Sequence, residues 1–331
     1  MPAVPMIELW RGGLLESVHL GHAVICDAAG GIVEAWGDPE AVIFPRSSCK
    51  MIQALPLLES GAADRFGLNE AQLALACASH NGAAIHTGAV GRWLDELGLG
   101  EGDLRCGVQM PDDPEARKGL VCSDTSPCQI HNNCSGKHTG FLTLTKHLGA
   151  GPEYHEVDHP VQRAVRAAFE EVTGEASPGF GIDGCSAPNF ATSVHGLARA
   201  MAFFAAARPD GGRREAAAAR LVRAMTQHPD LVAGEGRSCT RLMRAMGGRV
   251  AVKTGAEAVF VAILPEQKRG IAVKIMDGGT RGAEAAIVAL LRRLGVLAAD
   301  DPVLAPYLTG PITNRRGLAV GDIRLAPGFA A

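Results

Sequence analysis

Residues 249–276 read RVAVKTGAEAVFVAILPEQKRGIAVKIM. Turn residues separate three short apolar runs in this stretch, so we expect an antiparallel meander. The expected strands are 249–253, 258–264 and 270–276. Near the other end of the chain, the apolar runs 17–26 and 31–36 flank Asp27-Ala28-Ala29-Gly30, which is a hairpin signal. Strands near both termini predict one sheet that is built from the two ends of the chain.

The chain between these strands has the apolar spacing of helices. The expected helical segments are 51–58, 69–78, 88–97, 161–172, 193–206 and 214–225, with an amphipathic helix at 281–294. Pro56 is expected to kink or shorten the first of them. The stretch from Val108 to His138 is rich in Pro, Asp, Cys and Asn, and a loop of that length in a compact protein is usually functional.

Together these expectations predict an α/β (α+β) fold class, with an antiparallel sheet from both termini and an inserted helical lobe. A chain of 331 residues can bury a large core, and we expect residues 1–331 to form a single domain. The sheet lobe should take roughly residues 1–45 and 248–331, and the helical lobe roughly 46–247.

The composition excludes several classes of function. Hydrophobic residues make up 47% of the chain and charged residues 20%, as in globular proteins. A net charge of −3 without any Lys/Arg-rich run argues against a nucleic-acid partner. No apolar run is long enough for a membrane span, and residues 1–8 do not read as a signal peptide. The nine cysteines, an odd number, fit reduced thiols, so we expect a cytoplasmic protein.

Three short motifs, S-x-x-K, S-x-N and K-T-G, follow one another in this chain. They are Ser47-Ser48-Cys49-Lys50, Ser79-His80-Asn81 and Lys253-Thr254-Gly255. In this order they are similar to the acyl-transfer site of serine β-lactamases and penicillin-binding proteins. Ser47 and Lys50 share a face of a helix, so the lysine can take the proton of the serine.

The other two motifs supply supporting roles for such a site. Ser79 can shuttle a proton, and Asn81 can orient a carbonyl or an amide. Lys253 can supply positive charge or help to deprotonate Ser79. Thr254 can donate a hydrogen bond, and Gly255 lets the backbone approach a ligand.

Each motif also has a purely structural interpretation. Ser47 can be a helix cap beside an exposed lysine, and Asn81-Gly82 can be a helix stop. Lys253 can protect an edge strand from pairing with other chains. Taken alone, the three short patterns leave both interpretations open.

Two polar loops do not belong to the β-lactamase pattern: HNNCSGKHTG at 131–140 and GIDGCSAPN at 181–189. Thiolates of Cys134 and Cys185 could hold Zn²⁺ with one further nitrogen ligand, from His138 or Lys137. Lysine is rarely chosen as a ligand because it must lose its proton to coordinate. The alternative is two structural loops with buried thiols.

Five blocks in order make the chain resemble the rhizobial-type (class 3, thermolabile) L-asparaginases of the L-asparaginase II family over essentially its full length. The blocks are FPRSSCKMIQALP (44–56), ACASHNG (76–82), NNCSGKH (132–138), GIDGC (181–185) and KTG (253–255). The resemblance implies a fold like that of serine β-lactamases and glutaminases. It also implies hydrolysis of L-asparagine, a small-molecule substrate, to L-aspartate and ammonia.

The same resemblance implies two Ser–Lys pairs, Ser47 with Lys50 and Ser79 with Lys253, in which Ser47 is the nucleophile and Lys50 its base. One Zn²⁺ per chain would be held by residues matching Cys134, Lys137 and Cys185 together with water, and would assist substrate binding. A homodimer is implied as well. The remaining candidate contacts to the substrate or the zinc shell are Arg46, His80, Asn81, Asn133, His138, Asp183, Thr254 and Gly255.

Two rival functions remain open at this point. The first is another serine amidase on the same scaffold, either a β-lactamase or a glutaminase. The expected lack of an export signal counts against a β-lactamase, whereas one methylene in a pocket discriminates glutamine from asparagine by only about 1–3 kcal/mol. The second rival is a catalytically dead metal-binding or sensor protein, against which the presence of all four Ser and Lys residues argues.

Overall fold

The computed structural model describes residues 1–330, and the chain divides into two compact units. Unit 1 consists of Met1–Ser48, Thr192–Ala206 and the chain from Arg241 onward. Unit 2 consists of Cys49–Ala191 and Ala207–Thr240. None of the helices in residues 1–330 is long and apolar enough to cross a membrane.

Unit 1 contains an eight-stranded sheet. Its strands are β1 (Val4–Arg11), β2 (Leu14–Cys26), β3 (Ile32–Trp36), β8 (Ala251–Gly255), β9 (Val259–Leu264), β10 (Arg269–Ile275), β11 (Pro311–Thr313) and β12 (Ala319–Leu325). The order is β11-β12-β1-β2-β10-β9-β8, and β3 also pairs with β2. All of these pairings are antiparallel.

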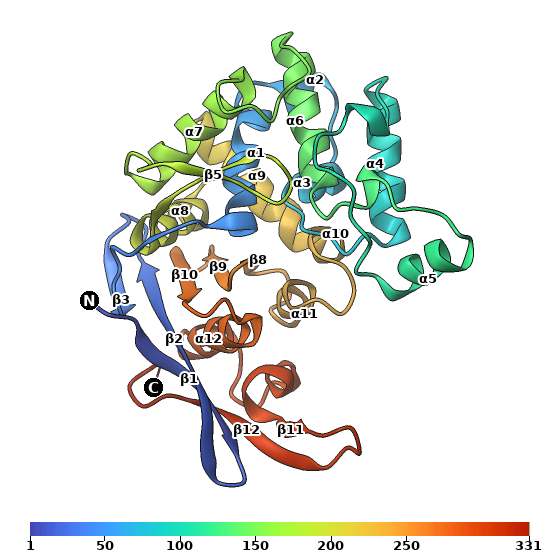
Figure 1. The fold of residues 1–331 in the computed structure, drawn as a ribbon. Coiled ribbons are helices and arrows are strands. Elements are labelled where there is room, and N and C mark those ends of the chain that lie inside the picture. The colour runs from blue at the N-terminus through green and yellow to red at the C-terminus, as the bar shows by residue number, and fades with distance from the viewer. Residues whose placement is uncertain (331) are drawn as a thin grey trace. The chain divides into compact units, whose positions relative to one another are not determined.

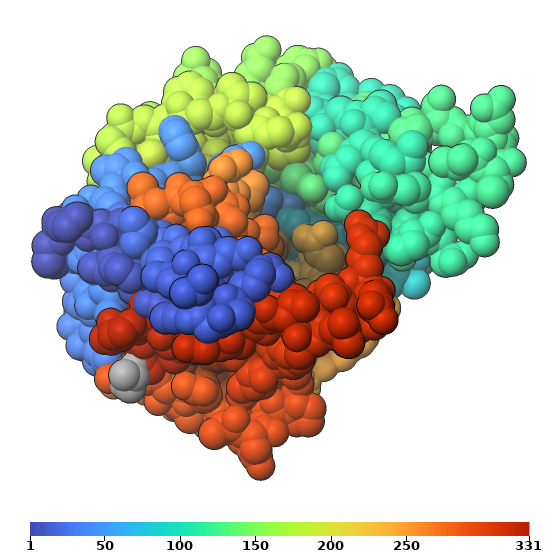
Figure 2. All heavy atoms as spheres, turned by 60° about the horizontal axis from the view of Figure 1, so that its bottom comes forward, coloured from blue at the N-terminus to red at the C-terminus, as the bar shows by residue number. Residues whose placement is uncertain are grey.

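The sheet joins the two ends of the chain twice. Ile7 of β1 pairs with Leu325 of β12, and Cys26 of β2 pairs with Gly270 of β10. Figures 1 and 2 show the result, with the blue N-terminal and red C-terminal segments of unit 1 lying side by side. Strands β1 and β2 are linked by Gly12 and Gly13, which both have positive φ (56° and 83°), as tight two-residue hairpin turns require.

Two helices cover opposite faces of this sheet, α8 (Val194–Ala206) and α12 (Thr280–Arg293). A Cβ on Gly270 would lie 2.1 Å from the backbone nitrogen of Ala202, so α8 lies directly on the β10 backbone. The first turn of α12 packs on the His19 ring, since a Cβ on Gly282 would lie 2.7 Å from it. Gly270 pairs with Cys26, so α8 covers the face to which Cys26 points. His19 lies seven residues before Cys26 on β2, so its side chain points to the opposite face, which α12 covers.

The remaining elements of unit 1 are short. They are β4 (Val42–Ile43) paired with β7 (Thr192–Ser193), the 3₁₀ turns η1 (Arg46–Cys49, ending in unit 2) and η4 (Pro302–Leu304), and the π-helical turn η5 (Ala305–Thr309). Helix α11 (Ser238–Ala245) begins in unit 2 and ends in unit 1.

Unit 2 is mainly helical. Its helices are α1 (Lys50–Glu59), α2 (Ala62–Arg65), α3 (Glu70–Ala76), α4 (Ala84–Glu96), α5 (Pro114–Cys122), α6 (Ser135–Leu148), α7 (Pro160–Thr173), α9 (Arg213–Gln227) and α10 (Pro229–Val232). It also has the 3₁₀ turns η2 (Glu101–Asp103) and η3 (Gln129–His131) and the hairpin β5 (Phe180–Ile182) and β6 (Pro188–Phe190).

Helices α1, α3 and α6 form the centre of unit 2. Helix α3 starts with a capping box, in which Asn69 Oδ1 accepts from the Gln72 N–H and Gln72 Oε1 accepts from the Asn69 N–H. Helix α6 is buried continuously over its first three turns. A Cβ on Gly136 would lie 2.5 Å from the carbonyl oxygen of Leu75, so α6 approaches the end of α3 at backbone distance.

The predicted fold class, a mixed α/β protein whose antiparallel sheet is built from both termini, is confirmed. One expectation is wrong in part: residues 108–138 are not a continuous loop, because they contain α5, η3 and the start of α6. Helix α5 escapes detection by periodicity because none of its residues is buried. It begins instead on a local signal, the Asp113 side chain accepting from the Ala116 N–H with Pro114 in the first turn.

Candidate active site

Lys50 is the centre of the candidate site within unit 2. It is the first residue of α1, and its side chain is almost completely buried. Its Nζ donates to the Ser79 hydroxyl at 2.9 Å, to the Cys134 sulfur at 3.1 Å and to the carbonyl oxygen of Ala78. The lysine of the S-x-x-K motif is therefore brought to the serine of the S-x-N motif and to one of the three candidate metal ligands, Cys134.

The segment that carries Ser79 is fixed through its backbone. It follows the end of α3, and the Ser79 N–H donates to the carbonyl oxygen of Val232. The His80 N–H donates to the Asn133 carbonyl, and the Asn81 carbonyl accepts from Asp113. Three chain segments that lie far apart in the sequence thus hold one tripeptide in place.

Both ring nitrogens of His80 form hydrogen bonds within the protein. Nδ1 accepts from the Gly82 N–H at 3.2 Å, and Nε2 lies 3.0 Å from the Ser135 hydroxyl, which donates to the carbonyl oxygen of Ile130. The ring stacks on His86 with 4.7 Å between centroids. Burial lowers the pKa of His80, so the ring is neutral at pH 7. This arrangement links the S-x-N segment to the start of α6.

Cys134, Lys137 and Cys185 form a buried cluster. Cys134 is the N-cap residue of α6, Lys137 lies one turn later, and Cys185 is at the tip of the β5–β6 hairpin. Lys137 Nζ donates to the Cys185 sulfur at 3.0 Å, and the Cys134 sulfur lies 2.9 Å from Asn133 Oδ1. The ammonium also lies 5.3 Å from the centre of the Phe141 ring.

The charges in this cluster follow from its hydrogen bonds. A hydrogen bond from Cys134 and the charge of Lys137 hold the pKa of Cys185 well below its usual range, although burial opposes them. The same bond and burial raise the pKa of Cys134. Burial disfavours the Lys137 ammonium, but Cys185 and Cys134 prevail and raise its pKa. The cluster at pH 7 is therefore a Cys185 thiolate paired with a Lys137 ammonium beside a Cys134 thiol.

These donors fit a soft divalent cation. Two sulfurs and one nitrogen in one buried cluster are the ligand types that Zn²⁺ takes in open, three-residue sites. Residues 1–330 hold no group of three or more His, Cys, Asp or Glu side chains suited to a metal. Binding would release the protons of Cys134 and Lys137.

His138 and Asp183 border this cluster. His138 is fully buried, with Nδ1 2.8 Å from the Tyr154 hydroxyl, and burial lowers its pKa to about 4. Asp183 precedes Cys185 in the hairpin loop, where its Oδ1 accepts from the Gly184 N–H and its carbonyl accepts from the Ser186 N–H. Ser186 has a φ of 68°, which is unusual for a residue other than glycine.

Unit 1 holds the other two motif serines and the K-T-G motif. Ser47 is half-buried in η1, directly after Arg46, whose φ of 53° lies in the left-handed region. The Ser48 hydroxyl donates to the Pro45 carbonyl at 2.7 Å. A Cβ on Gly255 would lie 2.6 Å from that same carbonyl oxygen and 3.0 Å from the Ser48 nitrogen. The glycine of K-T-G is therefore packed against the turn that carries Ser47.

Lys253 is completely buried in β8, opposite Val261 of β9. Its Nζ donates to the Thr254 carbonyl at 2.9 Å. Thr254 and Gly255 finish the strand. η1 runs directly into α1, so three residues of chain lead from Ser47 to Lys50.

A family model described as Asparaginase_II, L-asparaginase II, matches residues 7–325. The chain belongs to the L-asparaginase II family. The match covers both units and contains all of the motif residues described above.

Several solved structures are similar in fold to this L-asparaginase II family member. The native form of Mglu is 14% identical, with 86% of this chain and 67% of that chain covered and a TM-score of 0.46. A β-lactamase from Mycobacterium bovis is 14% identical, with 80% and 89% covered and a TM-score of 0.42. An octameric penicillin-binding protein homologue from Pyrococcus abyssi is 12% identical, with 85% and 75% covered and a TM-score of 0.37. A search of curated proteins finds no match.

Within unit 2, the structure brings together most of the residues that the sequence singled out. The set is Lys50, Ser79, His80, Asn81, Asn133, Cys134, Lys137, His138, Asp183 and Cys185. Sequence reasoning missed Ser135, His86 and Tyr154, whose contacts are described above. Ser135 lies inside the NNCSGKH block, so the sequence could have indicated it. Nothing in the sequence around Tyr154 indicates its contact with His138.

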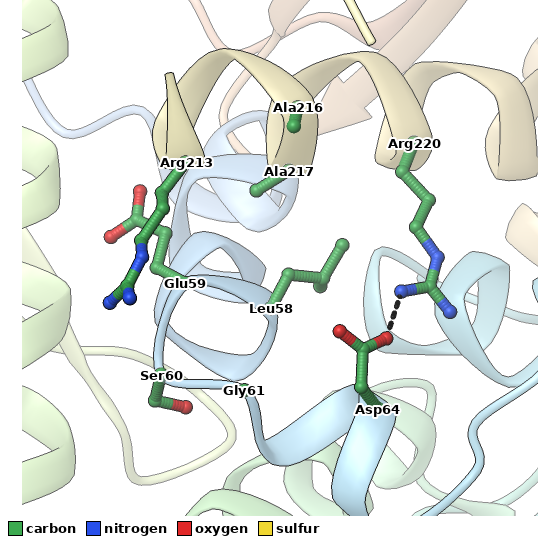
Figure 3. A pocket seen from close by; sticks show the side chains of 9 residues that line it. All are labelled: Leu58, Glu59, Ser60, Gly61, Asp64, Arg213, Ala216, Ala217 and Arg220. Atoms are coloured by element: carbon green, nitrogen blue, oxygen red, sulfur yellow. Dashed lines mark hydrogen bonds and ion pairs between the residues drawn. The ribbon is translucent and has the colours of Figure 1, made fainter. Parts of the chain in front are cut away.

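Unit 2 also has an open cavity of about 370 Å³, lined by α1, α2 and α9 (Figure 3). Its apolar lining residues are Leu58, Ala216 and Ala217. Most of the charged side chains that line it form ion pairs with other residues. Arg220 Nη1 lies 2.6 Å from Asp64 Oδ1, and both oxygens of Glu59 accept from Arg214. This cavity shares no residue with the Lys50 site, and we give it no role in catalysis.

Proposed function

We propose that this family member hydrolyses the side-chain amide of L-asparagine to L-aspartate and ammonia through an aspartyl-enzyme ester, as a rhizobial-type enzyme of the family. The observation that carries the proposal is the buried Lys50 Nζ, 2.9 Å from the Ser79 hydroxyl and three residues from Ser47. A buried lysine that is hydrogen-bonded to one serine and follows another by three residues is a base suited to activating a hydroxyl group.

In the first half-reaction, Ser47 Oγ attacks the amide carbon and its proton passes to Lys50. As a neutral amine, Nζ has two N–H bonds, which suffice for the Ala78 carbonyl and one further partner, and its lone pair is then available to accept a proton. Backbone N–H groups stabilise the oxyanion of the tetrahedral intermediate. The C–N bond breaks, and the nitrogen leaves as ammonia after receiving a proton through Ser79 and Lys253; the proton held by Lys50 then passes to Ser79 and replaces it.

In the second half-reaction, water attacks the ester carbon and Ser47 leaves with a proton. L-aspartate is released and the enzyme returns to its starting state. Zn²⁺ held by Cys134, Lys137 and Cys185 would supply fixed positive charge that orients the amino acid. Asn133 and Asp183 are proposed to position the substrate or these ligands, as are Arg46, Asn81, Thr254 and Gly255.

The experiment that tests the proposal is acid quenching during turnover of L-asparagine, followed by peptide mapping. We expect an aspartyl group on Ser47 and its absence from Ser47→Ala, with Ser60→Ala as a matched control outside the site. An aspartyl group on Ser79 would reassign the nucleophile. Unchanged ammonia release by Ser47→Ala would refute the proposed chemistry. No ammonia release from the wild-type protein would instead favour a binding or sensor protein.

Glutaminase activity is the second candidate, because the two substrates differ by one methylene. That difference is worth about 1–3 kcal/mol of discrimination, or roughly 10–200-fold in kcat/KM. Ammonia release from L-asparagine and L-glutamine, measured side by side, separates the two. A ratio that favours glutamine would overturn the proposed substrate but not the Ser–Lys mechanism.

We also propose that the enzyme is a cytoplasmic homodimer. The odd number of cysteines supports a reducing compartment, and the dimer rests on the family resemblance. Light scattering after size-exclusion chromatography and cell fractionation test the two statements. A monomeric mass, or recovery outside the cytoplasmic fraction, would contradict the corresponding one.

A further inference from the structure

The loop between α10 and α11 approaches the S-x-N segment within unit 2. It spans residues 233–237, and the carbonyl of Val232 just before it accepts from the Ser79 N–H at 2.9 Å. Gly234 is buried in this loop. A Cβ on Gly234 would lie 2.4 Å from Cγ, 2.5 Å from Oδ1 and 2.6 Å from Nδ2 of Asn81. The space that a side chain would take at position 234 is therefore filled by the Asn81 carboxamide.

Two features of position 234 require glycine. Its φ of 107° lies in a region that L side chains rarely adopt. The distances to the Asn81 carboxamide are also shorter than real Cβ contacts, so a methyl group at this position must displace either the amide or the loop. The loop is held from behind, because the buried Thr240 hydroxyl lies 2.7 Å from the Gly234 carbonyl oxygen and 3.0 Å from that of Pro229. The carboxamide is therefore the part that moves.

The Asn81 side chain is oriented by a second contact. Its Oδ1 lies 3.3 Å from the Ala83 N–H, and because that group is a donor, the oxygen of the amide points to it and the nitrogen points away. The Asn81 backbone is fixed as well, since its carbonyl accepts from the Asp113 N–H at 2.8 Å. Asn81 is only 5% exposed, and its Nδ2 has no hydrogen-bond partner within residues 1–330. Buried polar groups are normally paired, so this nitrogen is a fixed donor that is left for a ligand.

We propose that Gly234 is a positioning residue for Asn81: its bare backbone sets the plane of the carboxamide, so that Nδ2 is presented as a hydrogen-bond donor to the substrate. The inference rests on the proposed function and deepens it. An oxygen of L-asparagine, in its α-carboxylate or its side-chain carbonyl, would accept this bond. In this role Gly234 acts through Asn81 and not through contact with the substrate.

The same loop supplies a matched control. Gly236 also has a positive φ, of 77°, but it is exposed, and a Cβ on it would meet nothing within 4 Å. Gly236→Ala therefore introduces backbone strain in this loop without a contact to Asn81. A second control is Asn81→Ala, which removes all three atoms that the methyl group of Gly234→Ala would meet. In a double-mutant cycle the backbone strain of Gly234→Ala is present in both backgrounds and cancels.

The test is this double-mutant cycle on the full chain, with ammonia release from L-asparagine as the activity. A displacement of about 1 Å at a positioning group costs on the order of 100-fold in rate, so Gly234→Ala should lower kcat/KM by about 10–100-fold. In the Asn81→Ala background the same substitution should cost at most about threefold, because the atoms that it displaces are gone. Gly236→Ala should leave kcat/KM near the wild-type value.

A second readout does not depend on activity. In ¹⁵N NMR, Asn81→Ala identifies the side-chain amide signals of Asn81, which Gly234→Ala should shift and Gly236→Ala should not. Unchanged signals in Gly234→Ala overturn the proposal, as does an equal loss of kcat/KM in both backgrounds or in Gly236→Ala.

Folding and the proposed activity are separated from this result. If Gly234→Ala does not fold, the double variant with Asn81→Ala should fold, and failure of both overturns the proposal. If the wild type releases no ammonia, the proposed function fails, while the amide signals still decide whether Gly234 positions Asn81.

Discussion

Gly255 offers a clean steric test of the turn that carries Ser47. Its φ is outside the left-handed region, so Gly255→Ala introduces no backbone strain. The new Cβ would start 2.6 Å from the Pro45 carbonyl oxygen, whereas ordinary contacts begin at 3.4 Å. The turn or the strand end must therefore move by about 0.8 Å, and Ser47 moves with the turn.

A displacement of about 1 Å at a reacting group costs on the order of 100-fold in rate, so we expect kcat to fall by about 10–100-fold. Overpacking should also lower the free energy of unfolding by about 1–3 kcal/mol. Ammonia release gives kcat and KM, and urea unfolding gives stability. Gly91→Ala is the matched control, because a Cβ there meets nothing within 4 Å.

A kcat within twofold of wild type in Gly255→Ala would refute the reasoning that links this glycine to the position of Ser47. Loss of stability together with normal kcat in the folded fraction would refute it as well, because the contact would then be only structural. An equal loss of kcat in Gly91→Ala would show that the assay reports general damage.

Three further outcomes follow from the site. Lys50→Met removes the proposed base and should lower kcat by about 10²–10⁴-fold while the protein stays folded; a near-normal kcat would exclude Lys50 as the base. Cys185→Ser should raise KM more than it lowers kcat, and a loss confined to kcat would argue against a role in substrate orientation. Burial lowers the pKa of His86 from 6.5, so the unfolded chain takes up the proton first, and the free energy of unfolding should fall as the pH drops below about 6.5 toward the folded-state pKa. Urea titrations should show a shallower fall for His86→Gln, and an equal slope would contradict the assignment.

The elements that the sequence predicts well are those in which pattern and packing agree. Residues 259–264 are apolar throughout and form the fully buried strand β9. The Asn69–Gln72 capping box marks the start of α3 from local chemistry alone. Strand β1 was missed although Gly12-Gly13, which joins it to β2, is a local hairpin signal; its pairing with β12, more than three hundred residues away, has no local signal. Likewise, the spacing of α8 predicts a helix but not that it lies against β10.

The candidate site divides in the same way. Lys50 and Ser79 could be singled out because each stands in a short motif whose chemistry needs that residue type, whereas Cys134 as a metal ligand came from the family resemblance. Tyr154 could not, since its contact with His138 is defined only by where the chain brings its hydroxyl. His80 shows a further limit. Its motif suggests a ligand contact, but both ring nitrogens are committed to Gly82 and Ser135.

The pairing of β2 with β10 has a consequence for synthesis on the ribosome. Cys26 emerges early, and its partner Gly270 emerges only after most of the chain has been made. At about 5–20 residues per second, the delay is on the order of 10–50 s. During that time residues 21–26 of β2, which are buried in the finished sheet, cannot pair with β10. Translation speed and chaperone supply should therefore affect the yield of this protein more strongly than that of one whose sheet is closed by neighbouring strands.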